Sequence, residues 1–344
     1  MSPSVATTRM YREAAQSAEV VRAQLLANAA RTERLAARLR QSPPRALLTC
    51  ARGSSDNAAT FARYLIETRL GLLTSSAAPS VSSVYDASPD LAATVMLAIS
   101  QSGASPDLLA TVSSARAAGA YIVALVNAVD SPLAQLADEL IPLHAGVERS
   151  VAATKSYLAS LAAIVQLVAQ WSRDEALAAA LTEAPERLAR AWELDWSAAL
   201  APLRAARSLY VVGRGLGLGI AQEAALKLKE TCALHAEALS AAELRHGPMA
   251  LVGAHFPLLL FTQDDESRAG IVELAAELAG QGADVLIAGT GVAGTTELPT
   301  EAAHPVIEPL LFAQSFYRLA NALALARGID PDHPPHLRKV TATL

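Results

Sequence analysis

One order of segments occurs twice along this 344-residue chain: a short apolar run, a polar loop and a helix-forming stretch. The apolar runs are 46–51, 94–99, 208–212 and 257–261, and each copy has one further run, at 121–126 and at 284–288. The loops match in pairs, Arg52-Gly53 with Arg214-Gly215 and Ser100-Gln101 with Thr262-Gln263. In each pair the later loop stands 162 positions after the earlier one. Two pairs with one offset indicate an internal duplication.

This alternation is typical of α/β folds, in which a parallel sheet is covered by helices. We therefore predict two similar α/β domains, each a parallel sheet flanked by helices. The predicted segments are a helical extension at 1–44, a first domain at 45–172, a helical linker at 173–196, a second domain at 197–329 and a tail at 330–344. Within the extension, one helix is expected over 11–40. The prolines of the tail exclude a regular helix there.

The composition excludes several classes of protein. Hydrophobic residues make up 52% of the chain, yet no apolar run reaches the ~18 residues of a membrane span. Residues 1–10 lack the apolar core of a signal peptide, so we expect a cytoplasmic protein with no membrane partner. The net charge of −5 comes without a basic stripe, which argues against nucleic acid. Cys50 and Cys232 give neither a disulfide framework nor a metal-ligand spacing.

The loop at 100–105 is the first candidate binding site because it lies between an apolar run and a helix. Ligands bind at this end of parallel strands, and a helix N-terminus attracts anions. Hydroxyl groups at Ser100, Ser102 and Ser105 add donors, although helix capping alone would also explain them. The matching loop of the second copy carries three acids at 264–266, which would repel phosphate. We therefore predict one phosphate site per chain.

Three further positions have side chains suited to proton transfer or covalent chemistry. Lys227 and Glu230 share a helix face, either as a surface ion pair or as a carboxylate base with its orienting lysine. His246 lies in a loop-like stretch and could open a sugar ring, unless it is an ordinary surface histidine. Lys339, near the end of the chain, is either simply exposed or a Schiff-base lysine.

Two apparent motifs do not support a cofactor or a metal. The glycines of 213–219 lack the spacing of a dinucleotide fingerprint, so a tightly packed turn is expected there. The stretch His235-Ala-Glu237 is not followed by the Cys-x-x-Cys of a zinc deaminase.

Several stretches together resemble the double sugar-isomerase (SIS) domain family, and within it the isomerase half of glutamine–fructose-6-phosphate aminotransferases. They run in the family's order from about Met10 to the end of the chain. The matching stretches are Arg52-Gly-Ser-Ser55, Ser100-Gln-Ser-Gly103, Glu148-Arg-Ser-Val-Ala-Ala-Thr-Lys155, Ala225-Leu-Lys-Leu-Lys-Glu230, His235-Ala-Glu-Ala238, Glu243-Leu-Arg-His-Gly-Pro-Met-Ala-Leu251 and Leu337-Arg-Lys339. The resemblance implies two tandem SIS domains.

The resemblance also implies a role for each matching residue. A hexose or hexosamine phosphate would be bound by Ser55, Ser100, Gln101, Ser102, Ser105, Glu148 and Val151. Glu230 would move a proton between C1 and C2 beside Lys227, and His246 would open the sugar ring. Lys339 would form a Schiff base or close the pocket as part of the tail. A homodimer is implied, with His246 reaching the partner's site, and neither a metal nor a cofactor is implied.

Departures from the family pattern bear on the expected reaction. The usual Cys-Gly-Thr-Ser is Arg52-Gly-Ser-Ser, and Ala153 replaces a serine, which leaves the sugar epimer open. Only nine residues precede Met10, without a cysteine, so we expect no glutamine hydrolysis. In this family that absence favours deamination. We therefore predict a glucosamine-6-phosphate deaminase that yields fructose 6-phosphate and ammonia. The alternatives are galactosamine 6-phosphate or a glycated amino-acid phosphate as substrate, and a sugar-phosphate sensor without turnover.

Overall fold

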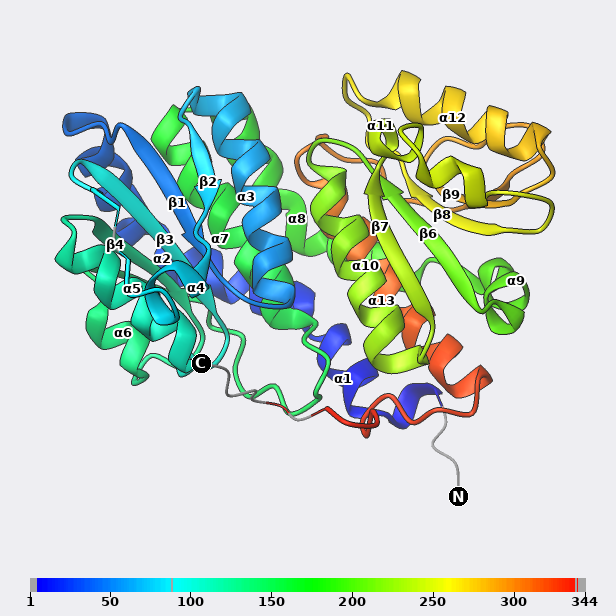
Figure 1. Cartoon of the computed structure of the whole chain (residues 1–344), viewed down its shortest axis with the longest axis horizontal. Coiled ribbons are helices and arrows are strands. Elements are labelled where there is room, and N and C mark those ends of the chain that lie inside the picture. Colours follow the sequence, from blue (N-terminus) through cyan, green and yellow to red (C-terminus); the bar gives the residue numbers. More distant parts are fainter. Residues whose placement is uncertain (1–4, 88, 338, 340–344) are drawn as a thin grey trace. The chain divides into compact units, whose positions relative to one another are not determined.

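The computed structural model describes residues 5–87, 89–337 and 339, and they form two compact units with one sheet each (Figure 1). The first-sheet unit contains 19–148, 155–182 and Lys339. The second-sheet unit contains 5–18, 149–154 and 183–337. Each unit therefore combines segments from distant parts of the sequence. The linear boundaries predicted at 45, 173, 197 and 330 divide the chain differently and stay a prediction.

Each sheet consists of five parallel strands in the same relative order. The first sheet runs β2-β1-β3-β4-β5, and the second runs β7-β6-β8-β9-β10 when read from the matching edge. The predicted α/β class with two parallel sheets is confirmed, and a shared strand order is what a duplication produces. The strands are β1 Ala46–Cys50, β2 Thr74–Ser76, β3 Thr94–Ser100, β4 Tyr121–Val126, β5 Glu139–Pro142, β6 Ser208–Gly213, β7 His235–Ser240, β8 Pro257–Phe261, β9 Asp284–Ala288 and β10 Thr296–Leu298.

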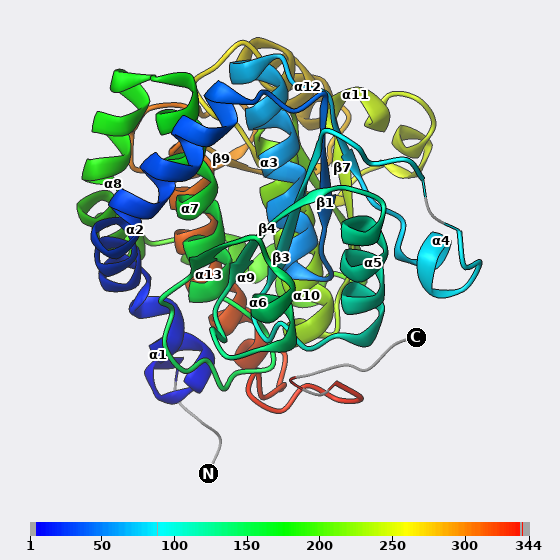
Figure 2. The same ribbon diagram turned by 90° about the vertical axis from the view of Figure 1, so that its left-hand side faces the viewer.

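Helices cover both faces of the first sheet, as Figure 2 shows with α5 on one side of the strands and α2 and α7 on the other. Met96 and Ala98 of β3 pack with Val112 of α5 and Leu133 of α6 in one apolar cluster. Because side chains alternate along a strand, the residues between them face the opposite helices. The helices of this unit are α2 Ser17–Gln41, α3 Ser54–Leu70, α4 Pro79–Ser83, α5 Pro106–Ala117, α6 Pro132–Leu136 and α7 Lys155–Ser172.

The second sheet is covered in the same way. Tyr210 and Val212 of β6 pack with Ile271 and Leu274 of α12. On the other face, α10 packs against β6 and β7 and also against α13. The helices here are α10 Gly217–Cys232, α11 Ala241–Leu244, α12 Arg268–Gly280 and α13 Glu308–Ala326. The remaining elements are η1 Val5–Thr7, α1 Arg9–Ala15, α8 Glu175–Glu193, η2 Ser197–Ala199, α9 Leu200–Ala205 and η3 Pro248–Leu251.

The N-terminal region differs from the single helix expected over 11–40. The structure has two helices there, because α1 ends at Ala15 and α2 begins at Ser17. The Ser17 hydroxyl donates to the carbonyl of Ala14 at 2.7 Å. The same carbonyl also accepts from the Gln314 side-chain amide at 3.1 Å, so two side chains cap the end of α1. The described tail residues 330–337 form turns rather than a helix, in line with their prolines.

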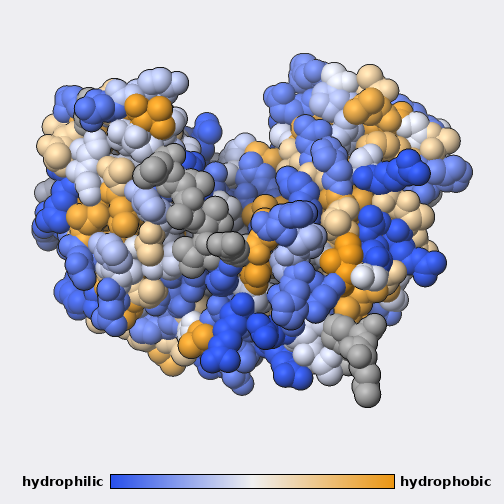
Figure 3. All heavy atoms as spheres, turned by 60° about the horizontal axis from the view of Figure 1, so that its bottom comes forward, coloured by the Kyte–Doolittle hydropathy of each residue, from blue (hydrophilic) through white to orange (hydrophobic). Residues whose placement is uncertain are grey.

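The surface of the described residues is of mixed character. None of their helices is long and apolar enough to cross a membrane. On the face drawn in Figure 3, hydrophobic residues form small groups between hydrophilic ones. Exposed large apolar side chains such as Leu26 and Tyr85 are ordinary in folded proteins.

Both cysteines are free, buried thiols, and we expect them to be unreactive in the folded protein. Burial raises the pKa of Cys50 to about 12 and that of Cys232 to about 11. The reactive thiolate is therefore scarce at pH 8. A disulfide reagent at pH 8 should label neither thiol in native protein and both in guanidinium. Labelling of native protein at the rate of the unfolded chain would contradict this burial.

Candidate active site

The candidate phosphate loop, residues 100–105, lies where the chain changes direction across the first sheet. From β1 the chain continues to β2 on one side, whereas β3 lies on the other side of β1. The loops that follow β1 and β3 therefore border a topological switch point. Open α/β sheets bind their ligands in the crevice at such a point.

The segment after β4 donates backbone hydrogen bonds to the phosphate loop. The N–H of Ala128 donates to the carbonyl of Gln101 at 3.2 Å, and the N–H of Leu133 donates to that of Gly103 at 3.1 Å. The Ser100 hydroxyl accepts from the N–H of Gly103 at 2.9 Å. Ser100 thus stabilises the turn itself, so its predicted phosphate contact stays a prediction. These bonds preorganise the loop.

The other predicted side chains of the loop are more exposed than that of Ser100. Gln101, Ser102 and Ser105 are half-buried, whereas Ser100 is buried. Ser105 occupies the N-cap position of α5 but makes no capping hydrogen bond with its side chain. Capping therefore does not account for this hydroxyl. It stands at the N-terminus of a 12-residue helix, where an anion is favoured.

Gly103 should be essential for the loop, and Gly71 provides a matched control. Both have φ of +62°, so alanine costs about 1–2 kcal/mol of backbone strain at either position. A Cβ at Gly103 would lie 2.7 Å from Ser131 Cβ and 2.9 Å from Val126 Cγ2, whereas a Cβ at Gly71 has no atom within 4 Å. In urea unfolding, Gly103→Ala should lose clearly more stability than Gly71→Ala. Equal losses would contradict the close packing behind the loop.

The loop after β1 contributes Ser55 and an ion pair. Ser55 is half-buried in the first turn of α3. Arg52 donates from Nε and Nη2 to Oδ2 of Asp107, at 2.8 and 2.6 Å. Asp107 is the second residue of α5, so this pair fastens the first loop to the helix that follows the phosphate loop.

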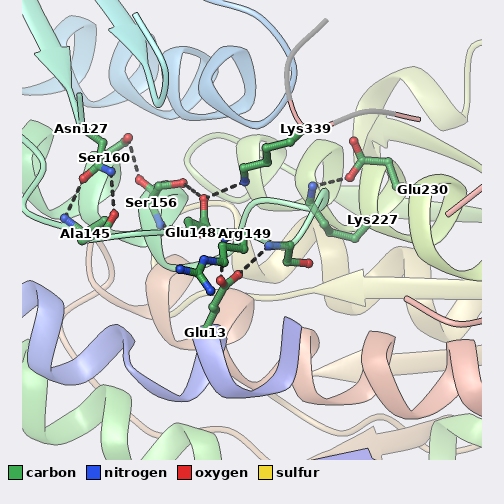
Figure 4. A network of polar contacts seen from close by, with 12 residues as sticks. Glu13, Asn127, Ala145, Glu148, Arg149, Ser156, Ser160, Lys227, Glu230 and Lys339 are labelled. Carbon is green, nitrogen blue, oxygen red and sulfur yellow. Dashed lines mark hydrogen bonds and ion pairs between the residues drawn. The ribbon is translucent and has the colours of Figure 1, made fainter. Parts of the chain in front are cut away.

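Glu148 and Lys339 meet within the first-sheet unit (Figure 4). Lys339 Nζ lies 3.4 Å from Oε2 of Glu148. The same oxygen accepts from the Ser156 hydroxyl at 2.6 Å, and Oε1 accepts from the Ser156 N–H at 3.2 Å. The Glu148 side chain is fully buried. In this structure Glu148 therefore joins the tail lysine to the first turn of α7.

Glu13 holds the segment that follows Glu148, and sequence reasoning missed it. Its carboxylate accepts from the backbone N–H groups of Arg149, at 2.6 Å, and Ser150, at 3.0 Å (Figure 4). These two bonds orient the stretch that leads to Val151, a predicted sugar contact that is half-buried. Glu13 stands three positions after the fully buried Met10, so its place on the apolar side of α1 was the available signal.

Lys227 and Glu230 form an ion pair in the second-sheet unit (Figure 4). The pair is not a surface pair, because the Lys227 side chain is 1% exposed and that of Glu230 is 21% exposed. A second carboxylate, that of Glu223, lies 3.7 Å from Lys227 Nζ and accepts from the Tyr317 hydroxyl at 3.0 Å. A buried ammonium group is costly unless it is paired, and here two carboxylates pair with it. Glu230 is the member that solvent or a ligand can reach.

Removal of Lys227 should destabilise the fold, and Lys229 on the same helix is the matched control. In Lys227→Met, Glu223 and Glu230 lose their partner, at a cost of about 3–5 kcal/mol. Lys229 is exposed, so Lys229→Met should change stability by less than about 0.5 kcal/mol. Guanidinium unfolding of both variants measures the difference. Similar midpoints for the two variants would contradict a buried network.

His246 stands apart from this network among the described contacts. It is exposed in the turn between α11 and η3, and its N–H donates to the carbonyl of Glu243 at 2.9 Å. Within the described residues, its ring forms no hydrogen bond or ion pair with Glu230 or Lys227. An exposed loop position is compatible with either a surface histidine or one that serves another subunit.

The second sheet's counterpart of the phosphate loop is filled by its own side chains. Gln263 is fully buried and donates to the carbonyl of Arg214 at 2.8 Å and to Asp265 at 3.0 Å. A Cβ on Gly217 would lie 2.5 Å from the Gln263 amide oxygen. The glycine-rich turn is therefore tightly packed, as predicted. This packing adds to the repulsion expected from the acids of this loop.

Comparison with known proteins identifies the family. A SIS domain model matches residues 41–170 and again 202–301. The chain belongs to the SIS domain family. One match falls on each sheet, so the molecule contains two tandem SIS domains.

Two curated relatives have the same name. The glutamine–fructose-6-phosphate aminotransferase of Aeropyrum pernix is 34% identical over 314 residues, which cover 85% of this chain and 50% of that protein. The enzyme of that name from Thermotoga maritima is 35% identical over 265 residues, which cover 71% and 43%. The chain spans about half the length of the curated relatives it matches, and it corresponds to their isomerase portion.

Solved structures agree with this relationship. A proposed phosphosugar isomerase from Silicibacter pomeroyi has a TM-score of 0.90 and 44% identity, covering 94% of this chain and 100% of that one. The C-terminal domain of glucosamine–fructose-6-phosphate aminotransferase from Francisella tularensis has a TM-score of 0.87 and 26% identity, covering 95% and 98%. A glucosamine-6-phosphate deaminase from Thermotoga maritima shares the fold, with a TM-score of 0.76 and 21% identity. These likenesses agree with membership of the SIS domain family.

Proposed function

We propose that this chain converts glucosamine 6-phosphate and water into fructose 6-phosphate and ammonia. The observation that carries the proposal is the buried network of Glu223, Lys227 and Glu230, in which only Glu230 is partly exposed. A protein that only bound sugar phosphate would need an anion site, but it would not need a buried lysine beside a reachable carboxylate. Such a carboxylate is suited to proton transfer.

In the proposed reaction, the phosphate of the sugar binds at the 100–105 loop and the other end reacts. After ring opening, Glu230 takes the proton from C2 and returns a proton to C1. The aldehyde oxygen gains the proton that the C2 amine loses, so C1 becomes an alcohol and the amine becomes an imine. Water adds to C2 and releases ammonia, which leaves the ketone of fructose 6-phosphate. One carboxylate serves both proton transfers, so neither a metal nor a redox cofactor takes part.

The neighbouring residues have supporting parts in this proposal. Lys227 orients Glu230 through their ion pair. Ser55, Gln101, Ser102, Ser105 and Val151 bind the sugar phosphate. Lys339, paired with Glu148, either closes the pocket or forms a transient Schiff base with the sugar carbonyl, which releases one water on forming and takes one up when it is hydrolysed. The relatives are named as aminotransferases that act on fructose 6-phosphate, which supports an aminosugar as the substrate class.

The proposal includes a homodimer in which His246 opens the sugar ring in the partner's site. Its support is the exposed position of His246 in a turn, with no recorded contact to Glu230 in the described part of the chain. Histidine titrates near neutral pH, so it can carry a proton to and from the ring oxygen.

Glu230→Gln should abolish most turnover while the protein stays folded. Loss of a general base lowers kcat by about 10²–10⁴-fold, because glutamine cannot take the C2 proton. Ammonia and fructose 6-phosphate are measured from glucosamine 6-phosphate without glutamine. The matched control is Glu266→Gln, an exposed carboxylate outside the network, which should turn over like the parent. Full activity of Glu230→Gln would refute its role as the base.

Parallel substrates decide between the related functions. Release of ammonia only from galactosamine 6-phosphate, or of amine only from a 6-phosphorylated glycated amino acid, would replace the proposed substrate. Binding of hexose phosphate without turnover of any of them would leave a sensor. If the site is shared between subunits, a mixture of Glu230→Gln and His246→Ala chains regains activity that neither variant has alone.

A further inference from the structure

We propose that Arg52 is a substrate-binding residue that donates directly to the phosphate held at the 100–105 loop. This inference rests on the proposed function, because it concerns the same phosphate site. The position is one where the chain departs from the family pattern, which has cysteine there, so the resemblance assigns it no role. The place, the contacts and the exposure of the guanidinium group all favour a phosphate ligand.

Arg52 lies at the switch point between the two loops. β1 ends at Cys50, and its neighbour β3 runs in parallel with Cys50 opposite Ala98. Two residues beyond Cys50 the chain reaches Arg52, and two residues beyond Ala98 it enters the phosphate loop. The first loop is therefore beside the second by the register of the sheet. The ion pair with Asp107 confirms this proximity, since Asp107 is two residues past Ser105.

The contacts use only part of the guanidinium group. Nε and Nη2 donate to the same oxygen, Oδ2 of Asp107, while Oδ1 accepts from the N–H of Leu108 at 2.8 Å. An arginine has five N–H donors, and three of them are not used in this pair. The Asp107 side chain is 2% exposed, whereas that of Arg52 is 52% exposed. In this ion pair the guanidinium group is therefore the member exposed to solvent.

The first loop has open space beside Arg52. Gly53 follows Arg52 with φ of +57°, and a Cβ placed there would have no atom within 4 Å. A phosphate dianion at the N-terminus of α5 would otherwise face the Asp107 carboxylate in the first turn of that helix. Like charges at this spacing repel each other. Arg52 removes the repulsion and supplies donors in the planar arrangement that suits phosphate.

Preorganisation of the guanidinium also favours phosphate binding. The group is already held by a buried carboxylate, so a bound phosphate immobilises little additional side chain. An arginine that served only to neutralise Asp107 would have no need of an exposed end. The two roles of Arg52 can be separated by experiment. When neutral residues replace both Arg52 and Asp107, no carboxylate needs neutralising, and any remaining loss of affinity reports phosphate binding by Arg52.

The test compares three variants with the parent for affinity toward inorganic phosphate and fructose 6-phosphate, measured by calorimetry. The double variant Arg52→Gln with Asp107→Asn removes both charges and leaves no buried carboxylate unpaired. It should bind both probes about tenfold more weakly, the loss expected for one charged hydrogen bond. Arg52→Lys should lose less than the double variant. Arg214→Gln removes the matching arginine of the second domain and should bind like the parent.

The outcomes separate the two proposals. If the parent binds both probes and the double variant binds them equally well, Arg52 only neutralises Asp107 and this inference is wrong. If the parent binds neither probe, the phosphate site itself fails and this inference fails with it. A double variant with a lowered unfolding midpoint is compared at a temperature well below that midpoint. A tenfold loss there, with a normal Arg214→Gln, supports direct contact.

Discussion

The parallel pairing of β1 with β3 is the constraint on which the candidate site depends. Parallel neighbours end at the same edge of a sheet, so the loops that follow them must lie together. Here one loop brings Arg52 and Ser55, and the other brings Ser100 to Ser105. The second sheet has the same pairing between β6 and β8, yet Gln263 fills its loop. The same topology thus provides a place for a ligand twice, and in the second sheet the buried Gln263 side chain occupies it.

The sequence predicted the inner strands of both sheets but not the edge strands. The six strands predicted from apolar runs are β1, β3, β4, β6, β8 and β9, which occupy the inner positions of the two sheets. The four strands without such a signal are β2, β5, β7 and β10, and these are the edges. Inner strands are buried on both faces and read as continuous apolar runs. Edge strands such as Thr74–Ser76 are short and polar, so nothing in their composition separates them from loops.

The candidate site was predictable wherever one helix or one loop carried the pattern. Lys227 and Glu230 are three positions apart, and the structure joins them as expected. The burial of that pair was not predictable, because Glu223 depends on Tyr317 of another helix, 94 positions away. Arg52 and Asp107 are 55 positions apart, and a salt bridge between them follows only from strand order. The chemical roles of the predicted site residues stay proposals.

The division of the chain into units has a consequence for its synthesis on the ribosome. Everything in the first-sheet unit up to Thr182 is made early, except one described residue, Lys339. That lysine pairs with Glu148 only after the whole of 183–337, and with it the second sheet, has been translated. The early unit can therefore form its phosphate loop long before it acquires its lysine. The contact between Glu148 and Lys339 therefore depends on residues that the ribosome adds after the second sheet.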